Sequence, residues 1–309
     1  MKIVEGIQPI AETEKLVLTI GMFDGVHKGH QSIINQLNER AKTINGHSAL
    51  LTLSPHPRRV LQPEEEFKLL SPLEEKIQLL ERYNLDYLII QPFDFNFSRT
   101  SSLDFVRDSL VNQLNIHTLI IGHDHQFGRN RAGDFQQLQE LSSLYNFDLK
   151  QLSAIEENAT PISSTKVRNA LKEGNVAYVS QALGRPYTLA GTVIHGDKIG
   201  RTLGFPTVNL AVNDEKLIPK NGVYGVNILI NGEKFQGLMN IGIRPTIQGK
   251  NQRIEVFIFN FERNLYEEKL SVEILCRIRD EQKFGSLEEL KKQIARDVSF
   301  FKNSEFYLS

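Results

Sequence analysis

The chain of 309 residues contains one cysteine, no tryptophan and almost no net charge. The single cysteine, Cys276, excludes an intramolecular disulfide, and its alternating apolar surroundings favour a buried structural thiol. No apolar run approaches the roughly 20 residues of a membrane span, and the first residues lack the pattern of a signal peptide. The net charge of −1 argues against a large nucleic-acid-binding surface. We therefore expect a cytoplasmic protein that binds neither membrane nor nucleic acid.

The first part of the chain alternates short apolar segments with amphipathic ones. Strands are expected at residues 16–20, 48–53, 87–90, 118–121 and 147–151, and helices at 31–44, 73–83, 102–114, 134–145, 166–171 and 176–183. Short strands that are almost wholly apolar are typical of a parallel sheet covered on both faces. The alternation therefore predicts a doubly wound α/β domain over residues 1–183.

The rest of the chain has a different rhythm. Alternating segments at residues 188–195, 222–230, 235–241, 253–259 and 270–278 are separated by glycine, asparagine and proline. The pair Asn231-Gly232 indicates a tight hairpin, and the set predicts a closed antiparallel barrel over residues 184–309. A last helix is expected at 287–300, with Ser286 as N-cap and Glu289 completing a capping box.

The segment Gly21-Met22-Phe23-Asp24-Gly25-Val26-His27-Lys28-Gly29-His30 carries the clearest chemical signal. It follows an apolar strand and precedes an amphipathic helix, so that it reads as strand, glycine-rich turn and helix. A helix N-terminus attracts phosphate, and glycines allow a ligand to approach the backbone. Imidazoles at this point can donate hydrogen bonds to phosphate oxygens as charge builds up. The pattern predicts a nucleotidyl-transfer site.

Three further polar clusters follow predicted strands or open a helix. They are Ser54-Pro55-His56-Pro57-Arg58-Arg59, the run from Gly122 to Arg129 and the run from Pro161 to Arg168. The last cluster offers hydroxyls and helix N–H groups, with basic side chains one turn on, and so predicts an anion cradle. A plain N-cap is the structural alternative for Ser163-Ser164-Thr165. Beside the histidine motif, the cradle is favoured.

The other candidate histidines can each be explained without metal binding or a contact with substrate. The spacing of His123 and His125 would suit zinc, but no cysteine is near and no third ligand is evident, so loop histidines beside a phosphate or a ring are favoured. For His56, flanked by two prolines, a rigid loop and a substrate contact are about equally supported.

In the second part, the glycine-rich segment from Gly196 to Asn209 brings compact oxygen donors together. Thr207 and Asn209 are two residues apart, face one side of an extended segment and could hold Mg²⁺ beside nucleotide phosphates. No P-loop pattern occurs in the chain, so a kinase here would be of another type. The structural alternative for this segment is a corner of the barrel at which glycine and proline interrupt the strands. Glu255 is either an exposed strand residue or a general base for phosphoryl transfer.

Together these motifs resemble the bacterial bifunctional riboflavin kinase/FMN adenylyltransferase family, also called FAD synthetase, over nearly the whole chain. The resemblance implies an N-terminal nucleotidyltransferase domain (1–183) that makes FAD and pyrophosphate from FMN and ATP. It also implies a C-terminal barrel domain (184–309) that makes FMN from riboflavin and ATP. Both steps would use Mg²⁺, with ATP as co-substrate and riboflavin, FMN and FAD as the other ligands. A weak homo-oligomer is left open.

The resemblance also implies roles for individual residues. In the adenylyltransferase, the catalytic histidines would be His27 and His30, and the ATP ligands Gly21, Phe23, Asp24, Gly29, Ser163, Ser164, Thr165 and Arg168. The flavin would be contacted by His56, Asp124 and Phe127. In the kinase, Gly200 and Thr207 would bind ATP, Thr207 and Asn209 would hold the metal, and Glu255 would be the base.

Two positions depart from the family pattern, and both fall on the flavin side of the adenylyltransferase. Ser54 stands where the family usually has an acidic residue, and His125 where it tends to have phenylalanine. We expect these departures to affect flavin affinity more than the chemistry.

Three other functions are weighed against this one. A class I aminoacyl-tRNA synthetase shares the His-x-Gly-His pattern, but no room is left for an anticodon-binding domain. A flavin-binding regulator without turnover is disfavoured because the candidate catalytic residues are all present. An enzyme with one inactive half would be detected only by separate assays of the two activities.

Overall fold

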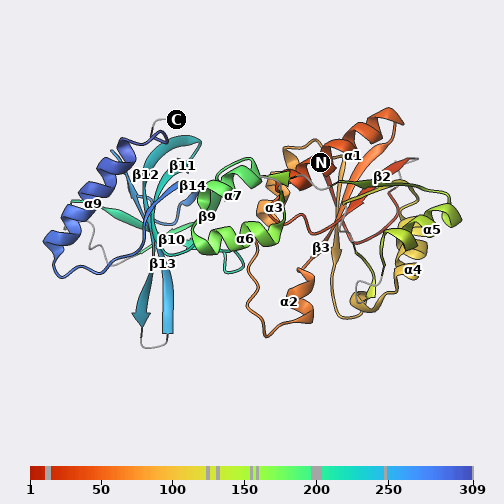
Figure 1. Cartoon of the computed structure of the whole chain (residues 1–309), viewed down its shortest axis with the longest axis horizontal. Helices are drawn as coiled ribbons and strands as arrows, with labels where there is room; N and C mark the ends of the chain where they lie inside the picture. Colours follow the sequence, from red (N-terminus) through yellow and green to blue (C-terminus); the bar gives the residue numbers. More distant parts are fainter. Residues whose placement is uncertain are drawn as a thin grey trace. The chain divides into compact units, whose positions relative to one another are not determined.

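The computed structural model describes residues 1–10, 15–122, 126–129, 133–153, 156–157, 160–195, 204–246 and 249–307 (Figure 1). The chain divides into two compact units, Met1–Ser164 and Thr165–Ser309. Helix α7 (Val176–Leu183) and nearly all of α6 (Ser164–Glu173) therefore fall in the second unit. The domain boundary expected near residue 183 stays a prediction.

The first unit is built on a six-stranded sheet with the order β1-β4-β3-β2-β5-β6, in which every neighbouring pair is parallel. The strands are β1 (Lys2–Glu5), β2 (Leu16–Ile20), β3 (His47–Ser54), β4 (Tyr87–Pro92), β5 (Ile116–Gly122) and β6 (Asp148–Leu152). The predicted parallel sheet is confirmed. The edge strand β1 was not predicted, because Lys2–Glu5 is short and largely exposed.

Helices cover both faces of this sheet, as a doubly wound fold requires. The helices packed on the sheet include α1 (Lys28–Thr43), α3 (Leu73–Glu81) and α5 (Phe135–Tyr145). The unit also contains the short helices α2 (Pro57–Leu61) and α4 (Ser102–Asp104) and one 3-10 turn, η1 (Phe97–Arg99). Alternate residues of each strand enter different cores. Leu16 and Leu18 of β2 pack with residues of α5, whereas Val17 packs with residues of α1 and α3.

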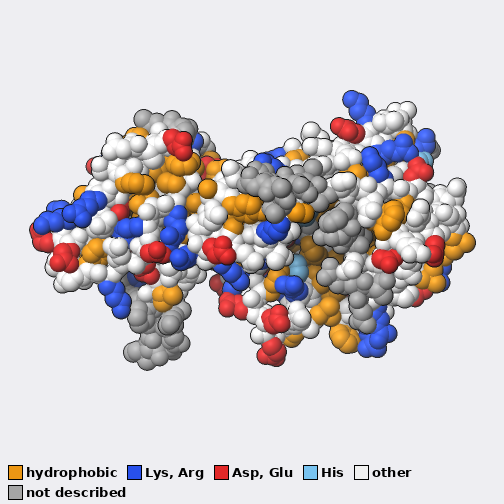
Figure 2. All heavy atoms as spheres, viewed as in Figure 1, with side chains coloured by type: hydrophobic (Ala, Val, Ile, Leu, Met, Phe, Trp, Pro, Cys, Tyr) orange, Lys and Arg blue, Asp and Glu red, His pale blue; other side chains and the backbone are white. Residues whose placement is uncertain are grey.

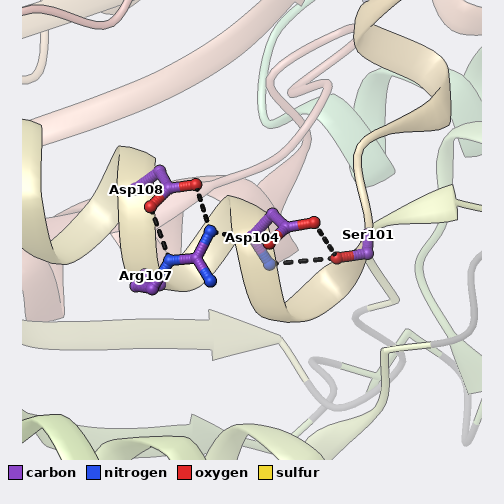
Figure 3. Close-up of polar contacts among 4 residues, drawn as sticks. All are labelled: Ser101, Asp104, Arg107 and Asp108. Atoms are coloured by element: carbon purple, nitrogen blue, oxygen red, sulfur yellow. Dashed lines mark hydrogen bonds and ion pairs between the residues drawn. The ribbon is translucent and has the colours of Figure 1, made fainter.

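The helix expected over residues 102–114 has an unusual form. Its first turn, α4, is capped by Ser101, whose hydroxyl accepts the N–H of Asp104 at 3.0 Å (Figure 3). The chain then continues as a π-helix over Phe105–Gln113 (η2). Arg107 holds Asp108 through two hydrogen bonds of 2.6 Å and Asp104 through one of 2.7 Å. The apolar pattern predicted a helix here, but not its wider winding.

The second unit contains a closed antiparallel barrel with the order β10-β13-β12-β11-β14-β9. The strands are β9 (Tyr187–Ile194), β10 (Thr207–Val212), β11 (Gly222–Ile230), β12 (Glu233–Thr246), β13 (Gly249–Ile258) and β14 (Lys269–Arg279). A two-stranded ribbon, β7 (Glu156–Glu157) with β8 (Thr160–Pro161), lies in the first unit. The predicted barrel is confirmed, including the hairpin at Asn231-Gly232, where both residues have positive φ.

The terminal helix α9 (Leu287–Lys302) packs on the outside of the barrel. Ser286 caps it by accepting the N–H of Glu289, as predicted, while the Glu289 carboxylate accepts the N–H of Gly285. Asp297 of this helix binds the Arg279 guanidinium of β14 at 2.8–3.0 Å. Basic and acidic side chains are mixed over the face drawn in Figure 2, in keeping with the net charge of −1.

Candidate active sites in the two units

The predicted phosphate-binding turn follows β2, the strand at which the order of strand addition in the sheet reverses. From β2 the chain winds through β3 and β4 on one side and through β5 and β6 on the other. Ligands of doubly wound sheets bind at the carboxyl ends of the strands at such a switch point. The turn that follows β2 carries His27 and His30, so the fold places the predicted motif where a nucleotide would bind.

The two imidazoles are stacked at the start of α1. The His27 and His30 rings lie 3.6 Å apart between centroids, with an angle of 18° between their planes. His27 is the N-cap, and its Nδ1 accepts the N–H of His30 at 3.4 Å. A Cβ at Gly29 would lie 3.1 Å from the His27 ring, so glycine leaves room for this ring. The motif thus combines a helix N-terminus with two imidazoles.

The backbone of the turn is held in an unusual conformation. Phe23, Gly25 and Val26 have φ angles of 47°, 81° and 41°. A positive φ is costly for a β-branched residue and persists only where the surroundings enforce it. The Phe23 ring, 2% exposed, packs in the core and lies 4.7 Å from the His30 ring. The buried ring of Phe23 therefore packs beside that of His30.

Asp24 fixes the turn to a distant loop. Its carboxylate, in a residue that is 2% exposed, accepts the N–H of Leu70 at 3.0 Å and the N–H of Ser71 at 2.9 Å. The Ser71 hydroxyl in turn accepts the N–H of Gly25 at 2.8 Å. The side chain of Asp24 therefore positions the turn. Its predicted contact with ATP stays a prediction.

The second predicted phosphate-binding segment begins against the same turn. The Ser164 hydroxyl donates to the carbonyl of Asp24 at 2.9 Å, which joins the start of α6 to the histidine motif. Ser163 and Ser164 belong to the first unit, whereas Thr165 and Arg168 belong to the second. The contacts of Thr165 and Arg168 with ATP remain predictions.

Electrostatics around the histidines involve a residue that the sequence analysis missed. Lys76 of α3 is 5% exposed, and its Nζ donates to Thr52 at 3.2 Å. Burial lowers the pKa of Lys76 to about 8, against an opposing effect of the Asp24 charge. Burial, followed by the nearby His27 and Lys76, holds the pKa of His30 well below its ordinary value, so this imidazole is neutral at pH 7. Its Nδ1 is buried and has no hydrogen-bond partner.

The residues predicted to contact flavin have separate surroundings. His56 caps α2 by accepting the N–H of Arg58 at 3.1 Å, and its ring lies 4.4 Å from that of Phe67. Phe127 is 8% exposed and packs in the core near Phe105. Asp124 lies outside the described residues, as do His123 and His125 with their alternative zinc interpretation. Flavin contacts by His56, Asp124 and Phe127 stay predictions.

Two residues predicted for the kinase, Asn209 and Glu255, lie in one row across the barrel. Asn209 of β10 is opposite Glu255 of β13, which is opposite Asn240 of β12. Directly opposed residues on neighbouring strands project from the same face, so the three side chains share one side of the barrel wall. Neighbouring positions such as Val256 and Met239 are fully buried and face the barrel interior. The row therefore lies on the outer face.

The structure extends the predicted kinase site. Thr207 is opposite Phe257, one step along the same face from the Asn209–Glu255 pair. Gly200 lies outside the described residues. Asn240 was not predicted as a site residue, although an amide between the apolar residues Met239 and Ile241 was the available signal. A Cβ at Gly242 would overlap the Glu281 carboxylate, which thus reaches over this end of the row.

Comparison with known proteins agrees with both units. The FAD synthetase family model matches residues 10–166, and the riboflavin kinase family model matches residues 183–304. The chain is 39% identical over 300 residues to the bifunctional riboflavin kinase/FMN adenylyltransferase of Escherichia coli strain K12, covering 96% of both chains. The protein of that name from Bacillus subtilis strain 168 is 36% identical over 304 residues, covering 94% of both.

A solved structure matches the chain over the length of both units. The crystal structure of a protein from Streptococcus pneumoniae named a macrolide-efflux protein superimposes with a TM-score of 0.90 and 28% identity, covering 98% of this chain and 99% of that one. In the present chain, no helix within the described residues has the length and hydropathy to cross a membrane. With two family models matched in order and full-length relatives at this level of identity, the chain belongs to the bifunctional riboflavin kinase/FMN adenylyltransferase family.

Proposed function

We propose that the chain carries out both reactions of its family, at two separate sites. The barrel phosphorylates riboflavin with ATP to give FMN and ADP. The parallel-sheet unit transfers the adenylyl group of a second ATP to FMN, which gives FAD and pyrophosphate. The observation that carries this proposal is that each unit holds groups suited to its own reaction: the stacked histidines in one, and the Asn209–Glu255 row in the other.

The adenylyl transfer needs no nucleophile from the protein, because the phosphate of FMN is itself the attacking anion. The protein must align the reactants and neutralise charge on the leaving pyrophosphate. The N-terminus of α1, with His27 and His30, supplies this neutralisation. Gly21 and Gly29 are further candidate ligands of the ATP phosphates, as are Ser163, Ser164, Thr165 and Arg168.

The kinase reaction removes a proton from an alcohol, and Glu255 is the base for the 5′-hydroxyl of riboflavin. Thr207 and Asn209 offer a hydroxyl and an amide carbonyl, which are hard oxygen donors suited to Mg²⁺. When bound, Mg²⁺ neutralises phosphate charge at the site. Asn209 is 8% exposed and adjacent to Glu255, so that the metal-binding and proton-accepting groups are held together by the sheet.

On the flavin side, His56 lies shortly after the end of β3, and its ring is tilted by 34° against that of Phe67, with 4.4 Å between the centroids. Riboflavin, FMN, FAD and ATP are the partners of this proposal, in the cytoplasm and without nucleic acid or membrane. A weak homo-oligomer is compatible with it.

The separation of the two sites is tested by mixing two inactive variants. His30→Ala should retain only the kinase reaction, and Glu255→Gln only the adenylyl transfer. Neither protein alone should convert riboflavin into FAD, but an equimolar mixture with ATP and Mg²⁺ should do so through released FMN. A mixture that makes no FAD, although each variant retains its expected half-reaction, would contradict independent sites linked by free FMN.

A further inference from the structure

Lys76 is a buried cation that the reactions described so far do not use. It lies in α3, is 5% exposed, and its Nζ donates to the hydroxyl of Thr52 at 3.2 Å. Thr52 in turn donates to the carbonyl of Met22, within the turn that leads to the histidines, at 3.3 Å. An ammonium group has three donors. Among the described residues, Lys76 has this one hydrogen bond.

A lysine is seldom buried unless its charge is compensated. The nearest compensating charge is the buried carboxylate of Asp24, but Lys76 forms no ion pair with it within the described residues. The Asp24 oxygens are instead bound by the N–H groups of Leu70 and Ser71. The ammonium therefore keeps unused donors beside the phosphate-binding turn.

A second buried nitrogen lies close to the same turn without a partner. The Nδ1 of His30 is buried and makes no hydrogen bond, and the charge of Lys76 helps to lower the pKa of His30. A shielded ammonium with donors to spare, beside a shielded imidazole nitrogen without a partner, fits an anion with several oxygens. The phosphate chain of ATP is such an anion.

We propose that Lys76 binds the phosphate chain of ATP during adenylyl transfer, as a third basic residue beside His27 and His30. This inference rests on the proposed adenylyl transfer. In the step, an oxygen of the FMN phosphate bonds to the α-phosphorus of ATP. The bond from that phosphorus to the bridging oxygen breaks, and its electron pair leaves with pyrophosphate. Lys76 keeps its proton and supplies charge and hydrogen bonds to the leaving oxygens.

The test uses the full chain and the variants Lys76→Gln and Lys76→Arg, with Gln78→Ala on the exposed side of α3 as the matched control. FAD formation is measured against ATP, and the reverse reaction of FAD is measured against pyrophosphate. Riboflavin phosphorylation in the same preparations reports intact protein. We expect Lys76→Gln to lower kcat/KM for both ATP and pyrophosphate about 10²-fold, as for loss of a donor to a developing anion. Lys76→Arg should retain more of both, and phosphorylation should be unchanged.

A merely structural Lys76 would behave differently. If it only balances Asp24, the double variant Asp24→Asn/Lys76→Gln should recover the affinity for pyrophosphate, and that recovery would overturn the proposal. Unchanged kcat/KM values in Lys76→Gln would do the same. If the wild-type chain forms no FAD at all, the adenylyl transfer itself fails, which is a distinct result.

A measurement on the wild-type chain covers the case in which the variants do not fold. The titratable groups that interact electrostatically with Lys76 are Asp24 and His30, and a protonated Lys76 is needed for phosphate binding. We expect kcat/KM for ATP to fall above about pH 8, as Lys76 loses its proton. Carboxylates and His30, whose pKa is lowered, have already lost their protons at this pH and would not cause the fall. A profile that stays level from pH 7.5 to 9.5 would overturn the proposal.

Discussion

The His27 and His30 rings stack 3.6 Å apart; the His30 ring lies beside that of Phe23, and His27, which is 6% exposed, caps α1. Two imidazoles at this distance, one of them beside a buried ammonium, do not both carry a proton at pH 7. We therefore expect them to act in catalysis as hydrogen-bonding groups placed at a helix N-terminus.

This arrangement predicts that His30→Ala abolishes FAD formation and leaves FMN formation unchanged. His27→Asn is a sharper test than alanine, because asparagine can still cap the helix but has no imidazole. We expect both variants to lose at least about 10²-fold in FAD formation. Both activities are measured on the same preparation. Loss of FMN formation as well, in a folded variant, would contradict the assignment of the histidines to one unit.

Glu255 and Asn209 are opposite each other on β13 and β10, and we expect both to serve only the kinase. Glu255→Gln keeps the shape of the side chain and removes the base, so riboflavin phosphorylation should fall about 10²–10⁴-fold. Asn209→Ala should also block it, while FMN supplied directly still becomes FAD. A kinase rate within about threefold of wild type in Glu255→Gln would show that Glu255 is not the base.

We expect replacement of Asp24 to change the stability of the fold more directly than the rate of the reaction. Its carboxylate accepts two backbone N–H groups in a buried site, and Asn at this position can accept with one oxygen only. Hydrogen bonds to a charged group contribute roughly 1.5–3 kcal/mol each, so Asp24→Asn should lower the free energy of unfolding by about 2 kcal/mol. Urea unfolding followed by far-UV circular dichroism measures this change. An unchanged unfolding midpoint would mean that Asp24 does not hold the turn.

The buried Lys76 also makes stability depend on pH. Its pKa is about 8 in the folded chain and 10.5 when unperturbed, so between these values the unfolded chain binds the extra proton. Stability due to this residue therefore rises with pH over that window. Relative to Lys76→Met, the wild-type free energy of unfolding should increase by up to about 3 kcal/mol from pH 7.5 to 10.5. A difference that stays constant over this range would show that Lys76 titrates normally.

Much of the fold could be predicted because local signals agreed with the final structure. The apolar segment Leu16–Ile20 and the segment Gly222–Ile230 form strands with the predicted bounds. Asn231-Gly232 adopts the positive φ angles that a two-residue hairpin requires. In each case the information lies within a few neighbouring residues.

The missed features depend on residues far apart in the sequence. Asp24 is bound by Leu70 and Ser71, and no local pattern links these positions. Lys76 follows two glutamates in an amphipathic helix and looks like a solvent-exposed residue until α3 is packed on the sheet. Asn240 becomes a candidate only when the barrel register places it opposite Glu255.

The most direct test of two activities on one chain is a time course of the purified protein with riboflavin, ATP and Mg²⁺, separated by liquid chromatography. We predict that FMN appears first and that FAD follows at its expense. FMN that accumulates without FAD, under both oxidising and reducing conditions, would contradict the account. That result would leave a riboflavin kinase whose first unit is inactive, with the departures at Ser54 and His125 as the positions to restore.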